Sequence, residues 1–190
     1  MTVLDVVKLV VQYIGESDLL KTTTLGGETV PSEQQTDKIN MLIDCVSDTV
    51  QNLAVMYFPL KKEEVVSSSS GSYSFTLFSK PLLDVLSVVD NRLKYSVDYS
   101  MFPNYFESKS GSLLVSYTYL PCEVTSISAE LEIVENKVTA RMIALGVVSR
   151  YFLITGMYQD ANNWNEMFER AILVAQRRKD NIVLKKRRWL

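Results

Sequence analysis

The spacing of apolar residues changes twice along this chain of 190 residues, and no other feature constrains the fold as strongly. At first, apolar residues recur every three or four positions, as in amphipathic helices. Between residues 61 and 124 they alternate instead, with Tyr73, Phe75 and Leu77 on one face, which is typical of half-buried strands. After Pro121 the helical spacing returns. The sequence therefore predicts helices on both sides of a β region.

Two helices are expected before the β region. The first spans residues 3–14, and Gly15 supplies its C-terminal stop. Ser32 is a suitable N-cap for a longer second helix over 33–58, which Pro59 ends because proline lacks the backbone N–H.

Two more helices are expected after it. Apolar residues at helical spacing run from Leu131 to Phe152 without a proline, and Gly156 marks the end of that segment. Asp160 begins another amphipathic segment. Its apolar face consists of Trp164, Phe168, Ile172 and Ala175.

Within the β region, strands are predicted at 72–77, 83–89, 93–97 and 113–119, as an antiparallel meander or a small sandwich. Asp90-Asn91 is predicted to form a tight hairpin, because both residue types tolerate positive φ.

The predicted fold class is α+β, a four-helix bundle-like domain with an antiparallel β insertion between the second and third helices. Residues 1–60 and 125–181 are expected to form a discontinuous helical domain, and 61–124 a β-sheet insertion lobe. Residues 182–190 are expected to form a basic C-terminal extension.

Charge is divided unevenly along the chain. From Arg170 to Leu190 there are eight basic residues and one acidic residue, Asp180, which gives a net charge of +7. Since the whole chain carries -2, the other residues carry -9. An acidic body with a basic end favours an acidic partner for that end.

Few residues suggest catalysis. Histidine is absent, which removes the commonest general base and metal ligand, and Cys45 and Cys122 are too differently placed for a disulfide scaffold or a metal site. The stretch 24–28 lacks the lysine of a phosphate-binding loop and is expected to be a flexible loop. The carboxylates considered as an acid–base pair or magnesium site are spaced like a solvated surface; they are Glu63, Glu64, Glu130, Glu132 and Glu135. The prediction is a protein that is not an enzyme and needs no cofactor or metal.

Aromatic residues are frequent in the β region. They suggest either nucleobase stacking on a sheet or the core and subunit contacts of a sandwich. Basic residues among them are few, which favours the second interpretation. The residues are Tyr73, Phe75, Phe78, Tyr95, Tyr99, Phe102, Tyr105, Phe106, Tyr117 and Tyr119.

The chain closes on four consecutive cations, followed by Trp189 and Leu190. Such a segment could increase solubility, bind nucleic-acid phosphates in a salt-dependent way, or insert into an acidic cleft of a partner protein. The tryptophan favours the last possibility, because it adds an apolar anchor to the charge. The predicted partner-binding residues are Lys185, Lys186, Arg187, Arg188, Trp189 and Leu190.

The order of two helices, β insertion and two longer helices is similar to the head-to-tail adaptor (connector) proteins of tailed bacteriophages. The turn Gly156-Met157-Tyr158-Gln159-Asp160, the apolar face from Trp164 to Ala175 and the basic aromatic ending carry the resemblance.

That resemblance implies a ring, commonly of twelve copies, docked beneath the portal protein, whose channel passes genomic DNA. Residues from about Ile182 to Leu190 would dock onto the portal. The β lobe would face outward or toward the next tail or neck ring protein, and its size leaves open whether it contacts tail, capsid or fibres. An acidic surface facing the channel would let DNA slide, while the basic end secures the subunit.

The implied location is the neck or tail of the virion, and the host cytoplasm during assembly. No membrane partner is expected, because no apolar run approaches the roughly 20 residues needed to span a bilayer. The alternative function is that of a nucleic-acid-binding accessory protein that uses the basic end.

Overall fold

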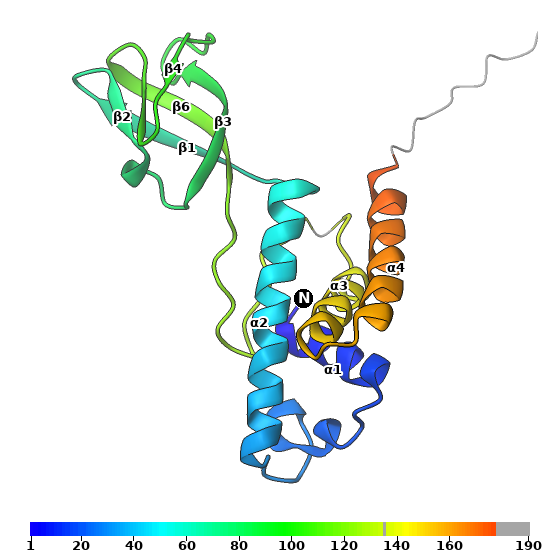
Figure 1. The fold of residues 1–190 in the computed structure, drawn as a ribbon. Coiled ribbons are helices and arrows are strands. Elements are labelled where there is room, and N and C mark those ends of the chain that lie inside the picture. The colour runs from blue at the N-terminus through cyan, green and yellow to red at the C-terminus, as the bar shows by residue number, and fades with distance from the viewer. Residues whose placement is uncertain (135, 178–190) are drawn as a thin grey trace, which may run out of the picture.

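The computed structural model describes residues 1–134 and 136–177. Four helices with their connections form a helical part, and residues 60–119 form a β part that projects from one end of it (Figure 1). In chain order the elements are α1 (Val3–Ile14), α2 (Glu33–Met56), β1 (Leu60–Ser68), β2 (Ser72–Ser74), β3 (Leu82–Asp90), β4 (Ser100–Met101), β5 (Tyr105–Glu107), β6 (Gly111–Tyr119), α3 (Ala140–Ile154) and α4 (Tyr158–Gln176).

Local capping sets the start of the first two helices. The Thr2 hydroxyl accepts a hydrogen bond from the Asp5 amide, and the Asp5 carboxylate accepts one from the Thr2 amide at 3.1 Å. Ser32 and Gln35 form the same arrangement before α2. The predicted helix at 3–14 and the Ser32 cap are confirmed, while α2 ends at Met56 and not at residue 58.

The prediction of helix from Leu131 onward is wrong for its first turns. α3 begins after Thr139, whose hydroxyl accepts from the Met142 amide. Residues 129–131 pair with the N-terminus, and a turn at 136–137 follows before α3. The Val3 amide donates to the Ala129 carbonyl at 3.0 Å, and the Leu131 amide donates to the Met1 carbonyl at 3.0 Å.

The β part contains two antiparallel three-stranded sheets, ordered β1-β6-β3 and β2-β5-β4. The predicted strand at 93–97 is absent among these strands; Ser96 forms only an isolated bridge with Val89. The turn after β3 also differs from the predicted tight Asp90-Asn91 hairpin. It extends to Tyr95, and its positive φ of 57° is at Lys94.

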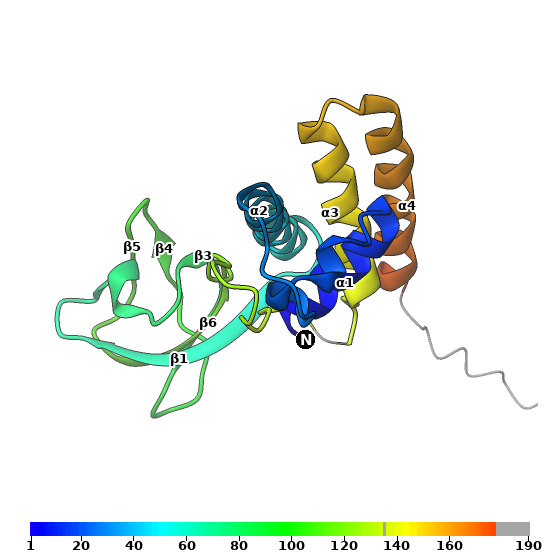
Figure 2. The ribbon, with the colours of Figure 1, turned by 90° about the horizontal axis from the view of Figure 1, so that it is seen from below.

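The predicted four-helix bundle with a single β insertion is wrong. The described residues form an α+β structure with four helices and two sheets, and α3 lies between α2 on one side and α4 on the other (Figure 2). α3 packs on α1, α2 and α4, whereas α4 packs mainly on α3. A bundle needs each helix to share one core, but only Ala161 and Ile172 of α4 are buried.

Close packing around α3 explains its glycine. A Cβ atom on Gly146 would lie 2.7 Å from Cγ2 of Thr49 on α2 and 3.0 Å from the ring of Phe168 on α4. Glycine therefore lets α3 approach both neighbours at the same level.

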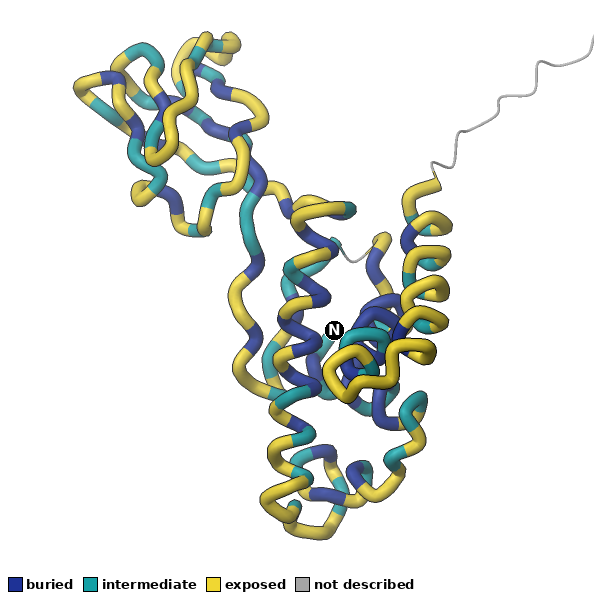
Figure 3. Tube along the Cα trace, in the orientation of Figure 1, coloured by how far each residue is buried: buried dark blue, intermediate teal, exposed yellow. Residues whose placement is uncertain are grey.

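Two separate clusters of buried apolar residues correspond to the two parts (Figure 3). The helical cluster is mainly aliphatic, with Val3, Val46 and Ile143 among its buried members. The β cluster is built around Tyr73, Phe106 and Tyr117. Whether the parts fold as separate domains with the bounds given above stays a prediction. Residues 182–190 lie outside the described residues.

Candidate functional site

The predicted docking residues Lys185, Lys186, Arg187, Arg188, Trp189 and Leu190 lie outside the described residues. The described part of the chain contains three kinds of candidate site, namely polar clusters, cavities and exposed apolar surfaces.

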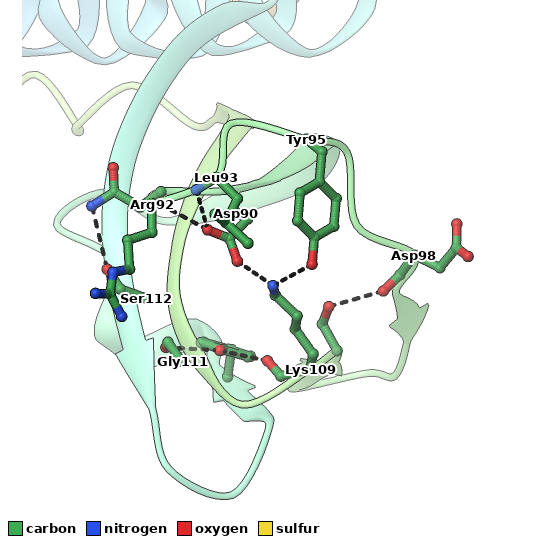
Figure 4. Close-up of polar contacts among 11 residues, drawn as sticks. Asp90, Arg92, Leu93, Tyr95, Asp98, Lys109, Gly111 and Ser112 are labelled. Atoms are coloured by element: carbon green, nitrogen blue, oxygen red, sulfur yellow. Dashed lines mark hydrogen bonds and ion pairs between the residues drawn. The ribbon is translucent and has the colours of Figure 1, made fainter.

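The most connected polar cluster lies in the β part and surrounds Asp90 (Figure 4). The Asp90 carboxylate accepts hydrogen bonds from the Arg92 and Leu93 amides at 2.8 and 2.7 Å and forms an ion pair with Lys109, which also donates to the Tyr95 hydroxyl at 2.6 Å. The Lys109 ammonium and the Leu93 amide lower the pKa of Asp90 from 3.8 to about 2. Every group in this cluster stabilises the turn after β3, so the cluster is structural.

Lys62, Glu64 and Ser79 form a second polar cluster on the β part. Lys62 lies 2.6 Å from Glu64 and donates to the Ser79 hydroxyl, which in turn donates to Glu64. A serine beside a lysine resembles a catalytic pair, in which the amine must be neutral to take a proton. Here the hydrogen bond to Glu64 raises the pKa of Lys62, which keeps the amine charged. Desolvation raises the pKa of Glu64, but bonds from Lys62 and Ser79 outweigh it and lower that pKa to about 2.

A third cluster connects the β part to residues 120–139, which lead back to α3. Lys80 forms an ion pair with Glu132, and its ammonium lies 3.4 Å from the sulfur of Cys122. The bond to Glu132 raises the pKa of Lys80 to about 12. Cys122 and Cys45 are both free thiols, and burial raises the pKa of Cys45 to about 11, so this thiol is unreactive.

The stretch once considered as a phosphate-binding loop is compact. Two short 3-10 helices, Leu19–Lys21 and Thr23–Leu25, precede Gly27, where a Cβ atom would lie 2.0 Å from the Lys21 carbonyl oxygen. The Thr29 amide and hydroxyl both donate to that same carbonyl. Glycine at this position is therefore explained by close backbone packing.

The carboxylates weighed as an acid–base or magnesium site are not brought together. Glu64 and Glu132 are paired with separate lysines, Glu63 is exposed on β1, and Glu135 lies outside the described residues. Within residues 1–134 and 136–177, no group of three or more acidic, cysteine or histidine residues could hold a metal ion.

The aromatic residues of the β part mostly form its core. The rings of Tyr73 and Phe106 stack with centroids 4.9 Å apart, and Phe78 meets the edge of Tyr117 at 4.8 Å. All four side chains are buried and cannot stack on nucleobases. Phe102 and Tyr105 stack on each other at 4.8 Å nearer the surface.

An apolar groove of about 720 Å³ lies between the start of α3 and the end of α4. Met142 and Leu145 of α3 and Met167 and Val174 of α4 give it an apolar floor. Its cations are Lys137, Arg141 and Arg170, and no acidic side chain lines it among residues 1–134 and 136–177. Arg170 also pairs with Glu166 at 3.2 Å just outside. This groove was not predicted from the sequence. The available signal was that Met167 and Val174 are apolar but lie outside the face of α4 that packs inward.

The turn between α3 and α4 is a second exposed apolar surface. Ile154 is 59% exposed and Tyr158 is 66% exposed, and Leu153 and Met157 are exposed beside them. These four neighbouring side chains form an apolar patch, and Leu173 and Val174 are exposed separately near the other end of α4. The hairpin is therefore the strongest candidate for a protein contact.

On the other side of α3, α2 presents an acidic face. Its exposed residues follow helical spacing along one side and are Glu33, Asp37, Asn40, Asp44, Asp48 and Asn52. A polar groove of about 430 Å³ beside this face is lined by Asp44, Asp48 and Glu123. Asp48 pairs with Arg150 at 3.0 Å, and no other ion pair occurs on this face within the described structure.

The sequence matches no model of a known protein family, and no curated protein matches it either. None of the four described helices is both long and apolar enough to cross a membrane.

Proposed function

We propose that the protein is a structural subunit of a tailed-phage virion, which forms a ring in the neck between the portal and the tail. In this role it provides a channel for DNA and a docking platform for tail components. The proposal joins the resemblance in the order of the elements to one structural observation, the exposed apolar surface of the α3–α4 hairpin.

The hairpin carries the proposal because its exposure is costly in an isolated subunit. Leu153, Ile154, Met157 and Tyr158 are all more than half exposed, at 56, 59, 53 and 66%. Apolar surface of this kind gains about 25 cal/mol for each Å² removed from water, so a subunit that buries it in an assembly is stabilised. The β part offers a second contact region away from the hairpin (Figure 1).

The test is quantitative mass spectrometry of purified virions from the source. A copy number close to that of the portal protein is expected for a neck ring. Absence from virions would contradict the proposal and favour the accessory nucleic-acid-binding protein.

Truncation after Asp180 tests the role of the basic end. It removes the four consecutive cations and Trp189 while leaving every described residue in place. The expected result is a folded protein that no longer enters virions, because its attachment to the portal is lost. Normal incorporation would remove the basic end from the mechanism, and loss of salt-sensitive DNA retention would support the alternative function.

A further inference from the structure

The α3–α4 groove and the acidic face of α2 have opposite charge. The groove is lined by Lys137, Arg141 and Arg170, and none of the described residues that line it is acidic. The acidic face of α2 carries four carboxylates and two asparagines, and Lys38, the one cation of α2, turns instead to Glu16 at 2.6 Å. Surfaces of opposite potential attract each other and discriminate against wrong partners.

The two surfaces belong to helices on either side of α3, because the groove is formed with α4 and the acidic face is on α2. Both views place α3 between α2 and α4, so one subunit cannot bring its own acidic face into its own groove (Figures 1 and 2). A molecule with two different, complementary surfaces associates head to tail, and such contacts close into a ring when the rotation between copies allows it.

Apolar side chains accompany the charges on both surfaces. Met56 is 68% exposed and Val55 is exposed next to it, at the C-terminal end of α2. Leu173 and Val174 are exposed at the C-terminal end of α4, by the groove. In Figure 1 both helix ends point toward the end of the helical part from which the β part projects. Rotation about an axis roughly parallel to α2 would keep these ends at the same level.

We infer that the α3–α4 groove receives the acidic face of α2, with Val55 and Met56, from a second copy of this chain. This inference rests on the proposed ring and names one contact between its subunits, which is separate from the exposed turn between α3 and α4. The chain's own continuation is a poorer occupant, because the residues after Gln176 begin with Arg177, Arg178 and Lys179, and the groove is already positively charged. Like charges next to each other in a contact oppose binding.

Two charge-reversal variants test the contact. The first reverses the groove with Arg141→Glu and Arg170→Glu, and the second reverses the α2 face with Asp44→Lys and Asp48→Lys. In each variant the two surfaces carry the same sign, so each protein alone is expected to sediment as a monomer while the wild type forms oligomers. All six positions of the test and control variants are on the surface, and far-UV circular dichroism verifies that the variants are folded.

Mixing the variants gives the decisive result. The first variant keeps a native acidic face and the second keeps a native groove, so an equimolar mixture is expected to associate, as is one chain that carries all four substitutions. A matched control, Asp84→Lys with Asp98→Lys, makes the same charge change on exposed positions of the β part and should keep the wild-type oligomer.

Three results would overturn the inference: a wild type that stays monomeric at its highest soluble concentration, a reversed variant that keeps the wild-type oligomer, or a mixture that remains monomeric. These results are separate from failure of the proposed function. If virions contain one copy of the protein per portal subunit and incorporate both reversed variants normally, only the proposed contact is contradicted. If the mixed variants associate as expected but the protein is absent from virions, only the proposed place in the neck is contradicted.

Discussion

The helical part and the β part are stabilised by different interactions. The helical core is mainly aliphatic and is centred on α3, which is buried on most sides, while α4 leaves most of its surface exposed. The β core is smaller and aromatic, and the loops around it are fixed by the Asp90–Lys109 ion pair and by hydrogen bonds from Ser79 to Glu64. Large apolar side chains are exposed in both parts, and seven of those on the helical part belong to the α3–α4 hairpin. The difference lies in the carboxylates, because the two whose pKa is lowered to about 2, Glu64 and Asp90, are both in the β part.

The largest expected effect comes from the aromatic core. Phe106 is fully buried and contacts the rings of Tyr73, Phe78 and Tyr99. Phe106→Ala should lower the free energy of unfolding by about 3–5 kcal/mol, through lost burial and the cavity that remains. Hydrogen exchange read by mass spectrometry should increase in residues 60–119 and stay nearly unchanged in α1–α4. Equal increases in both parts would show that they unfold as one unit and would break the comparison.

A smaller loss is expected at the centre of the helical part. In Gly146→Val the new side chain would collide with Thr49 and Phe168, and overpacking of this kind costs about 1–3 kcal/mol. Urea unfolding followed by far-UV circular dichroism measures the loss. Asn162→Val, at an exposed position of α4, is the matched control and should change stability by no more than about 0.5 kcal/mol. A well-tolerated Gly146→Val would mean that α3 can move away from its neighbours.

Acid should affect the β part first. The pKa of Asp90 is lowered from 3.8 and that of Glu64 from 4.5, each to about 2. Because the folded state holds these groups ionised, their stabilisation is complete above the ordinary pKa values and is lost as the pH falls toward 2. NMR spectra recorded from pH 5 to 2 should show the signals of residues 60–119 change before those of α3.

The variant Asp90→Asn with Glu64→Gln sharpens this prediction, because it should weaken the pH dependence of the β part in that range. Asp5 and Asp18 of the helical part also have lowered pKa values, but both are exposed surface groups, and their effect on the core should be smaller. Simultaneous acid unfolding of both parts would contradict the assignment of the acid-sensitive interactions to the β part.

The smallest effect on stability is expected at the end of α4. Leu173 is 61% exposed, so Leu173→Ala should change the free energy of unfolding by less than about 0.5 kcal/mol. Thermal unfolding of the monomer measures this change. A loss above 1 kcal/mol would show that the exposed surface of α4 already supports the fold of a single chain, in contrast to the partner contact argued above.

Some elements were predictable because their signals are local. Gly15 and Ser32 mark the first helix end and the second helix start, and both positions were predicted correctly from residue type and spacing. The spacing of Trp164, Phe168, Ile172 and Ala175 likewise identified the face of α4 that packs inward. Met167 and Val174 lie outside that inward face, where an amphipathic helix usually has polar residues, and they indicated a second apolar surface on α4.

The sequence by itself determined where the helical and alternating patterns lie, because side-chain direction follows directly from the backbone period. Only the tertiary structure decided the rest. Leu131 was predicted to begin a helix, but it pairs with the N-terminus instead, and β6 lies between β1 and β3 through long-range hydrogen bonds. Amphipathic spacing identifies the buried face of a helix but not the helix that packs on it. The position of α3 between α2 and α4 was therefore not predictable. The same holds for the groove and for the place of the acidic face, which depend on that position.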